Sequence, residues 1–257
     1  GSDNIIVLSV LGPISASIYY STKVFSSFVI AFVSKLIDNV IPGLNQLVGE
    51  GNIANTKRTY LLLIKYTYII ACMSFFAVQY LTGPFVNIWL GSAQFAGYWS
   101  SISFGLMVFV QLISHCHSTM YLAVGNKINR WSLLAVVFSS FGALLAFLTT
   151  PIFGLPACII SLSSANLLLT IFQIRNLHLN LQVSMNKYLS YVLPPFCIAC
   201  LVYSCGHLIY ASKLIQQNIF FIVFFFLLLC AIYIFLLVLS GFLKAEFLSA
   251  RDRFSRY

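Results

Sequence analysis

The sequence predicts an all-α fold, a polytopic bundle of transmembrane helices. Hydrophobic residues make up 60% of the 257 residues and charged residues only 7%, whereas a soluble domain carries about 25% charged residues. The apolar residues gather in long runs, and several of these exceed the roughly 20 residues that a helix needs to cross a bilayer. A water-exposed globular surface cannot be built from so few charges.

The charged residues lie between the runs, and the basic ones gather in every second gap. The gaps on one side of the predicted membrane hold Lys57, Arg58, Lys127, Arg130, Arg175, Lys187, Lys244, Arg251, Arg253 and Arg256. The gaps on the other side hold only Lys213. By the positive-inside rule the basic side and the C-terminus are cytoplasmic. The net charge of +9 therefore reflects topology and contact with anionic membrane lipids, and we expect no nucleic-acid partner.

The runs and their Gly and Pro borders predict one half-helix and seven spans. The half-helix covers about 3–11, and Gly12-Pro13 makes a tight turn after it. The spans follow at about 14–41, 58–82, 96–124, 130–150, 154–175, 188–210 and 218–243. Because the opening run Ile5–Leu11 is too short to cross a bilayer, we expect the chain to begin within a helix, as a fragment of a longer protein.

The seven cysteines do not have the pattern of a disulfide framework or a metal site. Most lie inside apolar runs, and the pair Cys197-x-x-Cys200 has no histidine or carboxylate beside it. We therefore expect buried thiols that pack between helices, with no metal and no cofactor.

Two opposite charges fall at the same depth of the predicted bundle. Asp3 lies nine residues before Gly12, and Lys23 lies ten residues after Pro13. At 1.5 Å per residue both lie about 14–15 Å from the turn, near the bilayer midplane, on adjacent antiparallel helices. An ion at this depth costs at least about 2.5–3.5 kcal/mol and needs a partner or water. The pair either lines a water-filled cavity or staples two helices together, and we favour the cavity.

Polar side chains share helix faces in three of the spans. The candidates for the wall of a substrate cavity are Lys23, Asp3, Tyr19, Gln111, His115, Asn166 and Gln173. Gln111 with His115, and Asn166 with Gln173, stand at helical spacing on one face. Such stripes line a solvated path in some bundles and form interhelical hydrogen bonds in others, and both interpretations stay open. We expect His115 to be a packed or pH-tuned residue and not a metal ligand.

Three further charged residues lie toward the predicted cytoplasmic half. Lys35 and Asp38 stand at i, i+3 and are expected to form a local pair. Lys65 is expected to extend along its helix toward the membrane surface. The last span, 218–243, holds almost no polar residues and is expected at the lipid-facing edge of the bundle.

Four segments follow one another along residues 3–180. They are DNIIVLSVLGPISASIYYSTKVFSSFV, IPGLNQLVGEGN, GPFVNIWLG and YLAVGNK. In the first segment an acidic residue, an apolar half-helix and a Leu-Gly pair are followed by a Tyr and a Lys on the next helix. This order resembles the second half of the bacterial polysaccharide transporters, the O-antigen and lipid-linked oligosaccharide flippases of the multidrug/oligosaccharidyl-lipid/polysaccharide exporter superfamily.

The resemblance implies a MATE-like fold of two pseudo-symmetric six-helix lobes around a central cavity. Residues 1–180 would form the C-terminal lobe, and residues 181–257 two peripheral transmembrane helices and a basic cytoplasmic tail. The missing N-terminal lobe of the same protein would be its partner. The implied function is translocation of an undecaprenyl-pyrophosphate-linked oligosaccharide across the bacterial inner membrane for surface polysaccharide biosynthesis, with Lys23 as the basic residue that attracts the pyrophosphate.

Two other functions stay open. A cation-coupled multidrug exporter of the same fold would be expected to have acidic residues in its cavity. This lobe instead offers the basic residues Lys23 and Lys65 for such a cavity, beside the acidic residue Asp3. A membrane enzyme of polysaccharide assembly would need a sizeable outer loop with catalytic Arg, His or carboxylate side chains. Because the outer gaps are short and nearly uncharged, we expect a transporter and not an enzyme.

Overall fold

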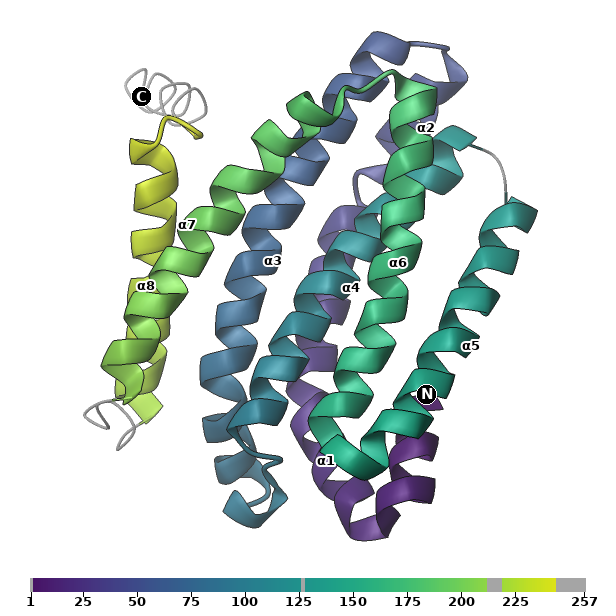
Figure 1. The fold of residues 1–257 in the computed structure, drawn as a ribbon. Coiled ribbons are helices and arrows are strands. Elements are labelled where there is room, and N and C mark those ends of the chain that lie inside the picture. Colours follow the sequence, from purple (N-terminus) through teal and green to yellow (C-terminus); the bar gives the residue numbers. More distant parts are fainter. Residues whose placement is uncertain (1, 126–127, 212–218, 244–257) are drawn as a thin grey trace.

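The computed structural model of the chain describes residues 2–125, 128–211 and 219–243, and every regular element in this part is a helix (Figure 1). The elements are α1 (Ser2–Asp38), α2 (Ile41–Gly49), α3 (Ile53–Trp89), the short 3-10 helix η1 (Ser92–Gln94), α4 (Tyr98–Gly125), α5 (Ile128–Phe153), α6 (Leu155–Leu181), α7 (Met185–Ala211) and α8 (Ile219–Leu239). Seven of these helices are long and apolar enough to cross a membrane. The prediction of an all-α, multi-pass membrane protein is confirmed at this level.

α1 folds back on itself at Gly12. This residue has φ of 82° and ψ of 175°, a conformation that glycine adopts without steric cost. In a straight helix Asp3 and Lys23 would stand about 30 Å apart, yet their side chains form an ion pair. The predicted turn between two antiparallel segments is therefore confirmed, and Figure 1 shows the purple chain reversing at the bottom of the view.

The predicted helix border at 82 is wrong because proline does not end the helix there. α3 passes through Pro84 and continues to Trp89, beyond the predicted end at 82. Proline removes one helical hydrogen bond, a loss that packed transmembrane helices tolerate. Pro42 lies in the first turn of α2, where its missing N–H has no helical partner to lose.

α4 occupies the centre of the main bundle. It packs against α1, α3 and α6, and α5 packs on α6. Large side chains such as Tyr60, Phe104 and Met120 are fully buried in this core. Small residues allow the closest helix contact, because a Cβ added to Gly142 of α5 would lie only 2.6 Å from the Cβ of Ala165 in α6. Close contacts of this kind are typical of membrane helix bundles.

α7 and α8 pack on α3 and on each other. Their contact is a second core cluster rich in aromatic side chains, among them Phe76, Tyr80 and Tyr233. Figure 1 places α8 at the left edge of the molecule and α5 at the right edge. α8 leaves Phe220 and Phe224 exposed, as expected for a lipid-facing helix. The division of the chain at residue 180 stays a prediction.

Basic side chains from different helices meet at one end of the bundle, which we name the basic end. Lys57, near the start of α3, donates a hydrogen bond to the carbonyl of Gln182, between α6 and α7. Lys187, at the start of α7, lies beside Lys57. The Gly12 turn and η1 lie at the opposite end, where the Ala96 N–H donates to the Thr22 hydroxyl over 2.9 Å. The predicted basic positions Lys127, Lys213 and 244–257, and the side chain of Arg130, lie outside the described residues.

All seven cysteines lie in the described part and are free thiols, but not all are buried. Cys72, Cys116, Cys158 and Cys230 are buried as expected. The expectation is wrong for α7, where Cys197, Cys200 and Cys205 are exposed, because α7 packs through only part of its circumference. The described residues include no cluster of three or more metal-ligating side chains.

Candidate functional site

A cavity of about 490 Å³ lies among α1, α4, α5 and α6. Its polar lining consists of Asp3, Lys23, Ser27, Gln111, Ser139, Ser163 and Asn166. Four of these residues are sequence-predicted candidates, namely Asp3, Lys23, Gln111 and Asn166. Both halves of α1 contribute to the wall because the turn at Gly12 sets them side by side.

The ion pair between Lys23 Nζ and Asp3 Oδ2 is the charged centre of this cavity. The hydroxyl of the buried Tyr19 donates to the same carboxylate oxygen over 2.8 Å. The side chains of Lys23 and Asp3 retain 22% and 12% exposure, so both ions face the cavity space. A lysine ammonium has three N–H donors, and the pair with Asp3 uses one of them.

Amide side chains complete the polar wall of this cavity. Gln111 comes from α4 and is exposed, whereas Asn166 comes from α6 and is half-buried. Each amide offers two N–H donors and a carbonyl acceptor. Ser139 of α5 was not among the predicted candidates, although a serine near the middle of an apolar span is a signal that could have found it.

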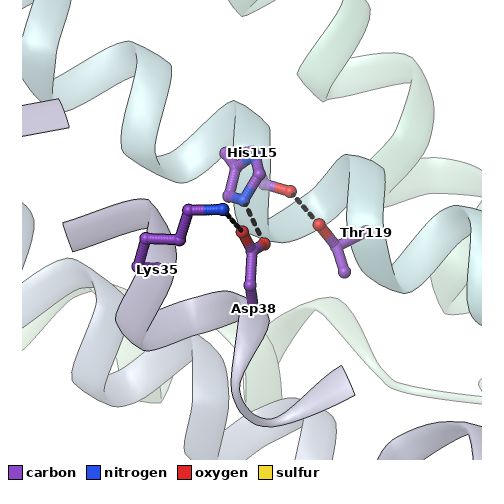
Figure 2. A network of polar contacts seen from close by, with 4 residues as sticks. All are labelled: Lys35, Asp38, His115 and Thr119. Carbon is purple, nitrogen blue, oxygen red and sulfur yellow. Dashed lines mark hydrogen bonds and ion pairs between the residues drawn. The ribbon is translucent and has the colours of Figure 1, made fainter. Parts of the chain in front are cut away.

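His115 lies outside this cavity. It belongs to a separate polar cluster with Lys35, Asp38 and Thr119 (Figure 2). Its Nε2 lies 2.7 Å from Asp38 Oδ1, and its carbonyl accepts a hydrogen bond of 2.8 Å from the Thr119 hydroxyl. Lys35 Nζ lies 3.9 Å from Asp38 Oδ2, which confirms the predicted local pair. The cluster joins α1 to α4, one helical turn beyond Gln111.

Gln173 also lies away from the cavity. Its side chain is fully buried and donates to the Ser118 hydroxyl of α4 over 2.9 Å. This contact is interhelical hydrogen bonding, one of the two interpretations that the polar stripes left open. Gln173 and His115 are therefore not brought together with Lys23.

That Lys65 extends toward the membrane surface stays a prediction, and its side chain ends on a backbone carbonyl near the predicted end of the last span. The residue is buried, and its Nζ donates to the Phe242 carbonyl just after α8 over 2.7 Å. The ammonium also lies 4.6 Å from the centre of the Phe242 ring. A cation at the carboxyl end of a helix complements the partial negative charge of its last carbonyls. Lys65 thus fastens α8 to α3 and takes no part in the cavity.

A buried polar network that the sequence did not indicate holds α7 on the main bundle. The Tyr188 hydroxyl lies 3.2 Å from His117 Nε2 and 3.2 Å from the Tyr68 hydroxyl. His117 in turn bonds through Nδ1 to the Ile113 carbonyl over 2.8 Å. All three side chains are buried, so the network is structural and does not reach a ligand space.

The cavity therefore combines one cation, one carboxylate and two amides in a membrane bundle. This set offers a ligand charge-assisted hydrogen bonds from the ammonium and neutral ones from the amides. In comparisons with known proteins, no family model, no curated protein and no solved structure matches this chain.

Proposed function

We propose that this chain is the C-terminal lobe, with two trailing helices, of a two-lobe MATE-like flippase. Its cargo is an undecaprenyl-pyrophosphate-linked oligosaccharide, moved across the bacterial inner membrane for surface polysaccharide biosynthesis. The observation that carries the proposal is the Asp3–Lys23 pair in the wall of a cavity within a membrane bundle.

A lone lysine inside a membrane costs about 2.5–3.5 kcal/mol, and Asp3 offsets this cost while the cavity is empty. A pyrophosphate carries more negative charge and more acceptor oxygens than one carboxylate, and it engages the donors of Lys23 that Asp3 leaves over. Gln111 and Asn166 then donate to phosphate or sugar oxygens from the other walls. The ligand class that this wall favours is an anion with polar neighbouring groups.

A cation-coupled exporter fits the same wall less well. A bound cation needs carboxylate oxygens as ligands, yet Asp3 Oδ2 already accepts from both Lys23 and Tyr19. No observation on the described residues favours an enzyme of polysaccharide assembly. The proposal places the basic end and the C-terminus in the cytoplasm, by the positive-inside rule.

The test is Lys23→Ala in the complete protein that carries this chain. We expect loss of surface polysaccharide with an unchanged amount of protein in the membrane, and partial activity for Lys23→Arg. Lys35→Ala is the matched control, because Lys35 lies on the same helix but is 83% exposed and does not line the cavity. Normal polysaccharide with Lys23→Ala contradicts the proposal.

A further inference from the structure

A second cavity, of about 640 Å³, lies among α3, α4, α7 and α8. Its wall includes Asn87 from the last turn of α3, Tyr98 from the start of α4 and Tyr210 from the end of α7. It therefore opens at the end of the bundle opposite the basic end, on a different side of α4 from the Asp3–Lys23 pair. Its volume falls within the range of about 300–1,000 Å³ that small-molecule sites have.

Three buried polar side chains in this wall have no hydrogen-bond partner among the described residues. They are Gln79 through Oε1, Tyr80 through its hydroxyl and Ser101 through Oγ. Their exposed fractions are only 7%, 1% and 2%. Buried polar groups in folded proteins are almost always hydrogen-bonded, and an unpaired one costs free energy. Three such groups around one cavity point to a ligand, or to water that a ligand replaces.

Aromatic rings form the rest of the wall. The rings of Tyr80 and Tyr210 lie 5.1 Å apart, centre to centre. The Tyr98 ring stacks on His207 at 5.5 Å, and its hydroxyl lies 3.2 Å from His207 Nδ1. These contacts hold Tyr80 against Tyr210 and Tyr98 against His207 in the wall of the cavity.

The sequence of α3 shapes the floor of the cavity. Gln79, Gly83 and Asn87 stand at i, i+4 and i+8 and so share one face of the helix. A Cβ added to Gly83 would lie 3.3 Å from the Phe95 ring, so this ring packs closely on the glycine. Pro84 has no N–H, and the Tyr80 carbonyl therefore loses its helical hydrogen bond at the same wall.

We propose that this cavity binds an uncharged sugar ring. None of the described lining residues carries a charge, which disfavours an ionic ligand. The hydroxyl groups of a sugar both donate and accept hydrogen bonds. They can therefore pair with the amides of Gln79 and Asn87 and with the hydroxyl of Ser101, which also donate and accept. The C–H face of a pyranose packs on aromatic rings such as those of Tyr98 and Tyr210. This inference deepens the proposed function and rests on it for the origin of the sugar. An oligosaccharide that the protein has carried across the membrane would reach this cavity at the end of the bundle opposite the basic end.

The experiment measures sugar binding to the purified full chain by saturation-transfer NMR. The protein is kept in amphipol, because glycoside detergents would offer a competing sugar. The probes are methyl glycosides of glucose, galactose and N-acetylglucosamine, and we expect at least one to bind with a Kd of about 1 mM. Ser101→Ala and Gln79→Leu should each weaken binding by roughly 5–10-fold, the effect of one neutral hydrogen bond.

Ser103→Ala is the matched control. It makes the same substitution in the same helix at a buried serine, but Ser103 bonds to the Trp99 carbonyl and does not line the cavity. The inference is overturned if no probe binds at about 50 mM. It is also overturned if Ser101→Ala binds as tightly as Ser103→Ala, or if glucose 6-phosphate binds more tightly than glucose.

A second arm separates the sources of the sugar. A glycosyl diacylglycerol in polymer-bounded lipid discs competes with the methyl glycoside if the site takes lipid headgroups, and fails to compete if it takes sugars from water. The binding assay does not depend on transport. Absence of binding removes this inference and leaves the Lys23 test untouched, whereas normal export by Lys23→Ala removes the proposed function and leaves sugar binding in place.

Discussion

Removing one or both charges of the Asp3–Lys23 pair separates its structural role from its role toward a ligand. Breaking a fully buried ion pair by removing one partner costs roughly 3–5 kcal/mol. Here the side chains keep 22% and 12% exposure to a cavity that admits water, and Tyr19 still donates to Asp3. We therefore expect Lys23→Ala and Asp3→Asn each to lower the free energy of unfolding by about 2 kcal/mol.

The double variant, with Asp3→Asn and Lys23→Ala together, leaves no unpaired ion. We expect it to lose about 2 kcal/mol in total instead of about 4, a coupling energy of about 2 kcal/mol, within the range measured for contacting residues. SDS-induced unfolding of the four purified proteins measures this cycle. A double variant as unstable as the sum of the single ones would refute the ion pair as the source of the effect.

The same four proteins are compared for surface polysaccharide at matched membrane levels. If Lys23 binds the carried anion, the double variant is no less stable than either single variant but still does not export, because the ammonium is missing. Asp3→Asn alone should keep part of the export. Recovery of export in the double variant would mean that the pair is only structural, and would remove Lys23 from the mechanism.

Three further predictions concern topology and packing. A reporter that works only outside the cytoplasm should be active when inserted at 91–94 and inactive at 49–52, and the reverse activities would invert the proposed orientation. Gly12→Ala should lower the unfolding free energy by about 1–3 kcal/mol through backbone strain alone, since open space surrounds the new Cβ; an unchanged melting temperature contradicts this. Gly142→Ala should destabilise the α5–α6 contact by about 1–3 kcal/mol, and the added change Ala165→Gly should restore the melting temperature by making room for the new Cβ.

The sequence predicted the features that depend on distance along a helix. The long apolar runs are the spans, and the turn at Gly12 followed from a Gly-Pro pair after a run too short to cross the bilayer. The contact between Asp3 and Lys23 followed from counting residues on either side of that turn. These inferences used only the rise per residue and the thickness of the hydrocarbon core.

The sequence could not predict which neighbour each helical turn meets. Gln111, His115 and Ser118 share one face of α4, yet they lie at three heights along it. Gln111 reaches the cavity, His115 meets Asp38, and Ser118 accepts a hydrogen bond from Gln173. A row of polar residues on one helix face therefore identifies candidates for lining a cavity. Only the packing of the neighbouring helices decides which of these residues face a shared space.

The predicted end of α3 was wrong for a related reason, because local sequence rules do not include the packing of neighbouring helices. Local rules assign Pro84 to the end of a helix because proline lacks an N–H donor, but α3 continues to Trp89 and forms the floor of the second cavity there. Gln79 was overlooked for the opposite reason, since a single amide in an apolar span fits no motif. Its side-chain carbonyl, which has no partner among the described residues, becomes informative only when the surrounding helices leave it buried.

The reversal at Gly12 explains why Asp3 and Lys23 meet at all, and helix length alone does not cause it, because α3 also has 37 residues and does not reverse. The 37 residues of α1 would extend about 55 Å as a straight helix, well beyond a hydrocarbon core of about 30 Å. A reversal keeps the apolar residues in lipid, and Gly12 is the residue that adopts the required backbone conformation. Once the chain reverses, polar residues at similar distances before and after Gly12 fall at one depth, however far apart they are in the sequence. The ion pair is thus a consequence of the turn, and the cavity depends on Gly12 as much as on Lys23.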